Sequence, residues 1–214
     1  MQNSDKDPIT PKTPRGRPRS FDRDAALGAA TRLFWQKGFA ATSIADLTEA
    51  MGIGAPSLYA AFGSKEALYA EALRHYGESF EGFVWTNFGT APTLRAAAEA
   101  FLMDSAAALT GSCSRGDPLG CMVTLSSVGS EGHAELGEMV KAARATGLER
   151  VKARMRRAMQ EGELPETTDI DGLARFVVAI QNGMSVMARD GASRDQLEAI
   201  ARHTMLGWDA RTAA

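Results

Sequence analysis

Hydroxyl and ammonium side chains close to residue 60 have types and spacings suited to holding a nucleic-acid backbone. Lys65 follows Ser64 at the expected start of a helix, where free backbone N–H groups, the positive end of the helix dipole and an ammonium group can all face a phosphate. Tyr59 offers a hydroxyl to a phosphate and a ring to a sugar or a thymine methyl group. These residues indicate contact with double-stranded DNA.

A cluster of arginines precedes this region. Arg15, Arg17 and Arg19 alternate with Gly16 and Pro18, and proline keeps such a stretch extended. Guanidinium groups on an extended arm are typical of arms that enter a narrow minor groove. A solvated basic tail is the alternative, and the sequence leaves both interpretations open.

The distribution of charge supports a DNA-facing N-terminal part. The 214 residues carry 24 Lys and Arg against 26 Asp and Glu, so the total charge does not indicate a general polyanion-binding protein. Residues 1–65, however, hold 9 basic and 6 acidic side chains, which makes the first part net positive and the remainder net negative. The sequence has neither a signal-peptide-like stretch nor an apolar run of membrane-spanning length, and we expect a cytoplasmic protein with no membrane contact.

Helical periodicity dominates the chain after residue 21, and the predicted fold class is all-α. Residues 1–20 are rich in proline and charge and are predicted to form a flexible basic arm. Helices are predicted over residues 22–37, 42–52, 56–62, 64–80, 93–109, 121–128 and 131–161, followed by two more before the end of the chain. Ser43 followed by Asp46 fits a capping box, while Gly38 and Gly52 are typical helix ends.

Three short helices joined by tight turns are what a helix-turn-helix requires, with the turn over residues 51–55. We therefore divide the chain into an arm (1–20), a helix-turn-helix domain (21–65) and a larger helical domain (66–214). The segments TSI at 42–44, MGI at 51–53 and SLYAAFGSKE at 57–66 resemble the tetracycline-repressor (TetR) family. This resemblance implies a homodimeric, DNA-binding repressor whose C-terminal domain binds an effector and mediates dimerisation.

Carried over from the family, Thr42 and Lys65 take positions that touch DNA phosphates. Ala55, Ser57, Leu58 and Tyr59 fall on or beside the recognition helix, although core packing is the alternative for Leu58. The recognition helix contains no Arg, Asn or Gln, so side chains for bidentate base readout are scarce.

The larger domain is predicted to hold an unidentified small, largely apolar effector and to form the dimer. Aromatic and methionine side chains lie on segments that surround the effector cavity in the family, with ordinary core packing as the alternative for each. These candidates are Phe80, Phe83, Trp85, Phe88, Phe101, Met103 and Met122. Apolar stripes on the last two helices are predicted to pack as a four-helix bundle across a two-fold axis, through Phe176, Ile180, Met184, Ile200 and Trp208.

Other classes of function find little support in the sequence. A small helical enzyme or carrier is the alternative class, but no nucleophile beside a base, paired carboxylates or phosphate-binding glycine loop is present. The three histidines lack metal-ligand spacing, and we expect neither a metal nor a cofactor. Cys113 and Cys121 lack a C-x-x-C spacing, and sensing of electrophiles or peroxide through either thiol stays open as a variant of the same regulator.

Overall fold

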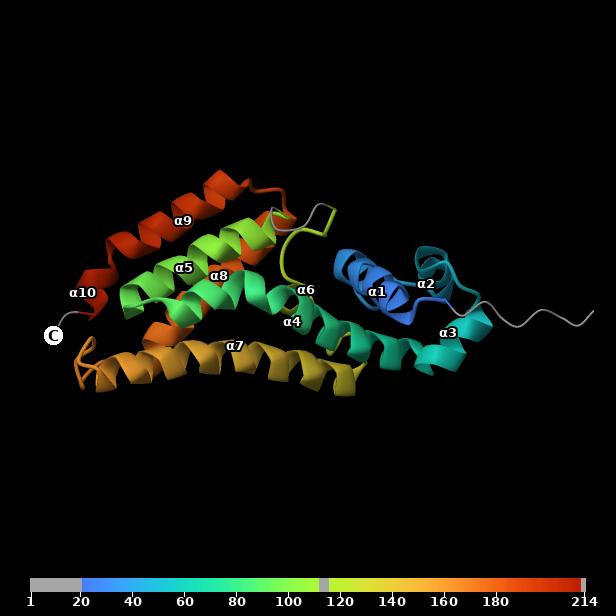
Figure 1. The fold of residues 1–214 in the computed structure, drawn as a ribbon, viewed down its shortest axis with the longest axis horizontal. Coiled ribbons are helices and arrows are strands. Elements are labelled where there is room, and N and C mark those ends of the chain that lie inside the picture. Colours follow the sequence, from blue (N-terminus) through green and yellow to red (C-terminus); the bar gives the residue numbers. More distant parts are fainter. Residues whose placement is uncertain (1–20, 112–115, 213–214) are drawn as a thin grey trace, which may run out of the picture.

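The computed structural model describes residues 21–111 and 116–212, and its regular elements are all helices, which confirms the all-α prediction. The helices are α1 (Arg23–Lys37), α2 (Ile44–Met51), α3 (Ala55–Phe62), α4 (Lys65–Thr90), α5 (Leu94–Leu109), α6 (Met122–Leu125), α7 (Ala134–Gln160), α8 (Ile170–Arg189), α9 (Arg194–Leu206) and α10 (Trp208–Thr212). Figure 1 shows an elongated molecule with α1, α2 and α3 gathered at one end and α5, α8 and α9 at the other. Helices α4 and α7 run along its length and join the two ends.

Local signals determine where the first helices begin and end. The Asp22 carboxylate accepts hydrogen bonds from the backbone N–H groups of Asp24 and Ala25 and thereby caps α1. Ser43 and Asp46 form the reciprocal capping box predicted for α2. Gly52 ends α2 at φ +65°, a backbone angle that favours glycine.

Helix α4 is longer than predicted, and the expected end near residue 80 was wrong. The helix continues to Thr90, and no proline interrupts residues 81–90. Phe88 from this continuation is buried, and Val84 and Trp85 pack against the same core as α5. At ~1.5 Å per residue, the 26 residues of α4 span roughly 39 Å.

Two hydrophobic clusters form the interior. The first combines α1, α2 and α3 with the first half of α4, α6 and the first turns of α7, from which Leu136 and Val140 contribute. The second is built mainly from α5, α8, α9 and the second halves of α4 and α7. The head therefore shares its core with helices of the larger domain, and the domain boundary at residue 65 stays a prediction.

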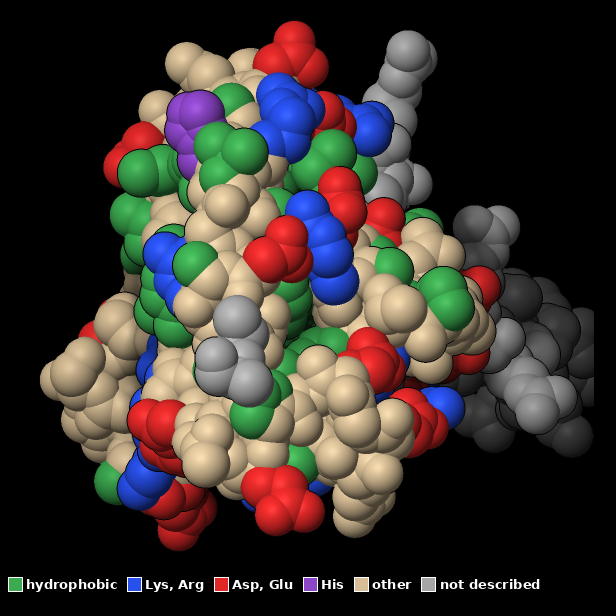
Figure 2. All heavy atoms as spheres, turned by 90° about the vertical axis from the view of Figure 1, so that its left-hand side faces the viewer, with side chains coloured by type: hydrophobic (Ala, Val, Ile, Leu, Met, Phe, Trp, Pro, Cys, Tyr) green, Lys and Arg blue, Asp and Glu red, His purple; other side chains and the backbone are tan. Residues whose placement is uncertain are grey.

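The end of the molecule farthest from α3 has a mixed surface. Figure 2 shows acidic and basic side chains interspersed on this face, with small hydrophobic patches between them. A surface of this kind lacks the one-signed field expected of a nucleic-acid interface, which directs attention to the opposite end.

Candidate nucleic-acid interface and ligand cavity

Helix α3 presents one face outward and buries the other. Ser57 and Tyr59 lie on the outer face, where 48% of Tyr59 is exposed. Leu58 and Phe62 point into the head core. Pro56 at the second position of α3 costs no helical hydrogen bond. The exposed side chains of α3 are free to contact DNA, with the apolar side holding the helix in place.

Two predicted DNA contacts are corrected by burial. Leu58 is fully buried against α1 and α2 residues of the head core, so its side chain cannot reach DNA. Thr42 is also fully buried, and its hydroxyl donates to the Gly38 carbonyl oxygen at 2.6 Å, where it stabilises the turn after α1. Ala55 is half-buried at the start of α3. Arg15, Arg17 and Arg19 lie outside the described residues.

Lys65 sits at the first position of α4, where the sequence placed it. Ser64 caps the helix through its hydroxyl, which accepts from the Ala67 N–H. The Lys65 ammonium lies 4.2 Å from the centroid of the Phe39 ring, and partial burial lowers the pKa of Lys65. Phe39 also contacts the His133 ring just before the start of α7, with ring centroids 4.4 Å apart. Lys65 therefore lies where the head meets the larger domain.

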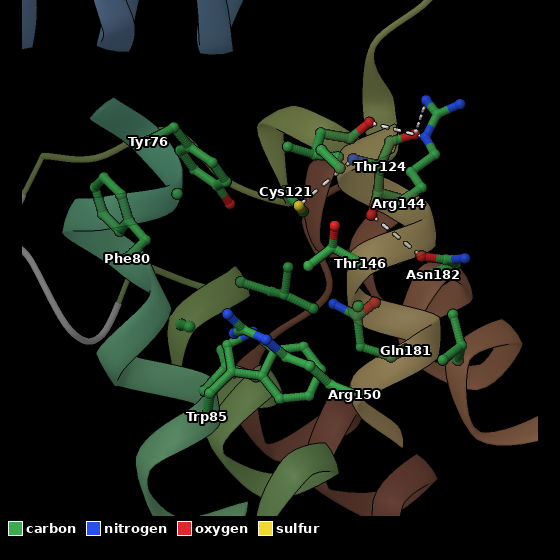
Figure 3. A pocket seen from close by; sticks show the side chains of 18 of the residues that line it. Tyr76, Phe80, Trp85, Cys121, Thr124, Arg144, Thr146, Arg150, Gln181 and Asn182 are labelled. Carbon is green, nitrogen blue, oxygen red and sulfur yellow. Dashed lines mark hydrogen bonds between the residues drawn. The ribbon is translucent and has the colours of Figure 1, made fainter. Parts of the chain in front are cut away.

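A cavity of about 360 Å³ lies between helices α4, α5, α6, α7 and α8 (Figure 3). One wall is aromatic, formed by Tyr76, Phe80 and Trp85 of α4 with Phe101 of α5. The opposite wall is polar. It is formed by Thr124, Arg144, Thr146, Arg150, Gln181 and Asn182. A cavity with an apolar side and a few polar groups is typical of a small-molecule site.

The structure corrects most of the predicted cavity residues. Phe80, Trp85 and Phe101 line the cavity, whereas Phe83 is 40% exposed and Met103 packs against the core. Phe88 and Met122 are buried in the two hydrophobic clusters, so neither reaches the cavity. Helical periodicity along α4 could have indicated which of its residues line the cavity. Leu73, Tyr76, Phe80 and Val84 recur at helical spacing and share one face, and all of them line the cavity.

The Cys121 thiol also lines the cavity. Its sulfur accepts a hydrogen bond from the Thr124 N–H at 3.5 Å, and Figure 3 shows the Tyr76 hydroxyl pointing toward it. Burial raises the pKa of Tyr76 well above its usual range, so the phenol stays protonated. Cys113 lies outside the described residues.

Residues 21–111 and 116–212 offer neither a metal site nor a membrane-spanning helix. No group of three or more His, Cys, Asp or Glu side chains there is arranged to hold a metal ion. None of the described helices combines the length and apolar character needed to cross a bilayer.

Comparison with known proteins identifies the fold. Residues 26–72 match the family described as bacterial regulatory proteins, tetR family. The chain is 37% identical over 199 residues to the HTH-type transcriptional repressor ComR of Escherichia coli K12, covering 92% of this chain and 93% of ComR. The chain belongs to the TetR family. It is a transcriptional regulator and not an enzyme.

Solved structures of TetR-family regulators agree with this identification. A cysteine-substituted variant of the regulator CifR, in complex with 26 bp double-strand operator DNA, is 38% identical and superposes with a TM-score of 0.84. The match covers 90% of this chain and all of the CifR chain. The chain is also 51% identical to the HTH-type transcriptional repressor BdcR of Escherichia coli K12 over 70 residues. This match covers 32% of this chain and 36% of BdcR.

In this TetR-family chain, hydrogen bonds join the cavity wall directly to α1 of the head. The Trp35 indole N–H donates to the Gly120 carbonyl oxygen at 3.1 Å. The Arg189 guanidinium, at the end of α8, donates to the carbonyl oxygens of Leu119, Trp35 and Gln36 at 2.9, 2.9 and 3.2 Å. Because Trp35 and residues 120–121 also line the cavity, one network touches both the cavity and the head.

A further ion pair lies at the same junction. Arg32 of α1 donates to the Asp117 carboxylate at 2.8 Å, and the Asp117 side chain is almost completely buried. The sequence gives no signal for Arg32, Asp117 or Arg189, because contacts between residues so far apart along the chain leave no local pattern.

The predicted dimer residues divide into two groups. Met184 and Trp208 are only 1% and 2% exposed within a single protomer, so their side chains are unavailable to a partner and this prediction was wrong. Phe176, Ile180 and Ile200 are half-buried. The large apolar side chains that α8 and α9 leave exposed are instead Val186, Met187 and Leu206, with Leu206 82% exposed.

Proposed function

We propose that the protein represses transcription by binding a palindromic operator as a homodimer, and that a small molecule in the cavity releases it from DNA. The observation that carries this proposal is the continuity of α4, which begins at Lys65 beside the exposed face of α3 and lines the cavity with Tyr76 and Phe80. The operator-bound structure of the similar regulator CifR supports the DNA-binding half. Such a regulator works in the cytoplasm, where bacterial DNA is located.

A dimer is required because a single short recognition helix reads too few base pairs, and two-fold symmetry matches a palindromic site. We place the dimer interface on the faces of α8 and α9 that carry Met187 and Leu206. Large exposed apolar side chains on neighbouring helices form the kind of surface that a second copy covers.

Ligand binding reaches the head by two routes in this proposal. The first is α4, whose displacement at Phe80 moves Lys65 because the helix is continuous. The second is the hydrogen-bonded junction between residues 119–121 and the end of α1. A ligand releases DNA only if it binds the DNA-free conformation more tightly than the DNA-bound one.

The proposal is tested by selecting duplexes from a random DNA library with the full-length protein. Enrichment of a palindrome, together with sedimentation of the complex as one or more dimers per duplex, is the expected result. Recovery of duplexes without a common sequence, or binding by a monomer, would contradict it. Calorimetry with free protein and with the protein–operator complex then tests release, because linkage requires an inducer to bind the complex more weakly.

A second mode of induction is favoured by one observation, the position of the Cys121 thiol in the cavity wall. In this mode an electrophile is attacked by the thiol and the covalent adduct, rather than a reversible ligand, shifts the equilibrium. N-ethylmaleimide, to whose double bond a thiol adds without a leaving group, is the probe. Loss of operator binding on alkylation that Cys121→Ser abolishes and Cys113→Ser retains would support this mode; equal loss in both variants would exclude it.

A further inference from the structure

The charged side chains of the cavity lining are already engaged. Among the described residues that line the cavity, the only Lys, Arg, Asp or Glu side chains are Arg144 and Arg150. The Arg144 guanidinium donates to three backbone carbonyl oxygens, those of Val123, Thr124 and Ser126. Arg150 is exposed and lies over the Trp85 ring, so solvent screens its charge. A charged ligand would lose water here without gaining an unpaired counter-charge, which favours a neutral ligand.

One polar side chain of the lining has no hydrogen-bond partner in the part of the chain that the structure describes. The Gln181 amide, on α8, points into the cavity (Figure 3). Other polar groups of this wall are paired. The Thr146 hydroxyl donates to the Ala142 carbonyl oxygen at 3.0 Å, and the Thr124 hydroxyl donates to the Asn182 side-chain oxygen at 3.1 Å. Gln181 therefore offers both a carbonyl acceptor and an NH₂ donor to a ligand.

The amide of Gln181 defines the hydrogen-bonding edge that a ligand needs. A primary amide presents its C=O and NH₂ groups side by side. The complementary edge carries an N–H next to a C=O, as in a lactam, and two hydrogen bonds then form at once. Such a site discriminates against an analogue that lacks one of these groups, because part of the Gln181 amide is then left unpaired.

The aromatic wall favours a flat ligand. The Tyr76 and Phe80 rings stack with centroids 5.0 Å apart, and the Trp85 and Phe101 rings lie 4.9 Å apart at 34°. Flat ring faces of this kind pack well against a planar aromatic molecule. The cavity volume of about 360 Å³ is near the lower end of the usual range for ligand sites, and it suits one or two fused rings.

We propose that the effector is an uncharged, planar heteroaromatic lactam of one or two rings, with its ring against the aromatic wall and its N–H and C=O edge paired with Gln181. This proposal rests on the proposed function, because it names the ligand class of the same cavity. It narrows the expectation of a small, largely apolar effector by requiring a donor and an acceptor side by side on one edge.

Three probes built on the same two-ring skeleton provide the test: 2-quinolinone, quinoline and quinoline-2-carboxylate. The first carries the lactam edge, the second is neutral at pH 7.5 and lacks the N–H, and the third is an anion. Calorimetry with the full-length protein at pH 7.5 is expected to show 2-quinolinone binding about tenfold or more tightly than quinoline, because quinoline leaves the Gln181 carbonyl unpaired. The anion should bind most weakly, because its charge is desolvated without an unpaired partner.

Gln181→Leu removes the amide and keeps a side chain of similar size, and it should reduce the preference for 2-quinolinone over quinoline to less than about threefold. Gln160→Leu is the matched control. Gln160 is exposed at the end of α7 and does not line the cavity, so the same change there should leave the preference intact. The three probes on the unaltered protein need no variant, so they decide the proposal even where Gln181→Leu does not fold.

The proposal is overturned if quinoline binds as tightly as 2-quinolinone, if the anion binds most tightly, or if none of the probes binds at about 1 mM. It is also overturned if folded Gln181→Leu keeps the tenfold preference. Operator binding by the unliganded protein is measured in parallel. Intact DNA binding with any of these outcomes refutes only the ligand class, whereas its absence refutes the proposed function.

Discussion

The junction at Arg189 provides a direct test of how the cavity communicates with the head. Replacing Arg189 with methionine keeps a long, flexible side chain and removes all three hydrogen bonds that tie Leu119 to the end of α1. Partial burial lowers the pKa of Arg189, yet the guanidinium stays charged at neutral pH. We expect Arg189→Met to uncouple ligand binding from DNA release while leaving both individual sites intact.

The size of the effect follows from the contacts. At a typical net value of ~0.5–1.5 kcal/mol per hydrogen bond, three bonds contribute roughly 1.5–4.5 kcal/mol. Arg189 is only half-buried, and water will replace part of what is lost, so about 1–3 kcal/mol is the expected change. Allosteric coupling energies are also about 1–3 kcal/mol, so loss of this junction is large enough to remove most of the ligand effect.

Fluorescence anisotropy of a labelled operator duplex, with and without a saturating ligand, measures the coupling. We expect the ratio of the two dissociation constants to fall to less than about threefold in Arg189→Met, with ligand-free operator affinity within about threefold of the original protein. Arg175→Met, which removes a surface ion pair with Asp171 on the same helix, is the control and should keep the full ratio. An unchanged ratio in Arg189→Met would refute the junction route and leave α4 as the carrier of the signal.

Four further outcomes are expected. If Lys65 contacts a phosphate as proposed, Lys65→Ala should weaken binding to all DNA sequences alike and reduce the slope of log affinity against log salt by about one unit. A sequence-dependent loss would contradict this role. Tyr59→Ala should weaken operator binding more than binding to random duplexes in competition assays, and equal losses would remove Tyr59 from sequence readout. Leu206→Glu should shift sedimentation toward monomer, because it places a charge on the exposed apolar face of α9, and a persistent dimer would place the interface elsewhere. Gly120→Ala should lower the free energy of unfolding in urea by roughly 2–5 kcal/mol, because φ is +76° and the added Cβ would lie 2.8 Å from a backbone oxygen of α8. Gly82→Ala is the control: its Cβ meets nothing closer than 3.9 Å inside α4, so the free energy of unfolding should stay the same or rise by up to ~1 kcal/mol. Equal destabilisation by both changes would refute the steric argument.

Local chemistry in the sequence was enough to predict the head. Capping by Ser43 and Asp46 and the stop at Gly52 depend on hydrogen bonds and backbone angles within a few residues, so they can be inferred before any tertiary structure is known. The same holds for the placement of Lys65 at the start of α4 and of Tyr59 on α3. Helical period alone, however, did not distinguish Tyr59, which is exposed, from Leu58, which is buried, as DNA contacts.

Tertiary packing decided the features that depend on which apolar face meets which neighbour. Both Trp208 and Leu206 lie near the C-terminal end and are apolar, yet the first is buried in the core and the second is exposed. An apolar stripe in the sequence indicates that one face of a helix will be buried, but it does not indicate which part of the protein will cover that face. The cavity and the Arg189 junction join residues more than 60 positions apart, and their geometry exists only once α4, α7 and α8 have packed. The sequence by itself therefore determined the caps and most of the helix positions, which are local, whereas the tertiary structure decided burial, the cavity and its link to α1, which depend on contacts between distant parts of the chain.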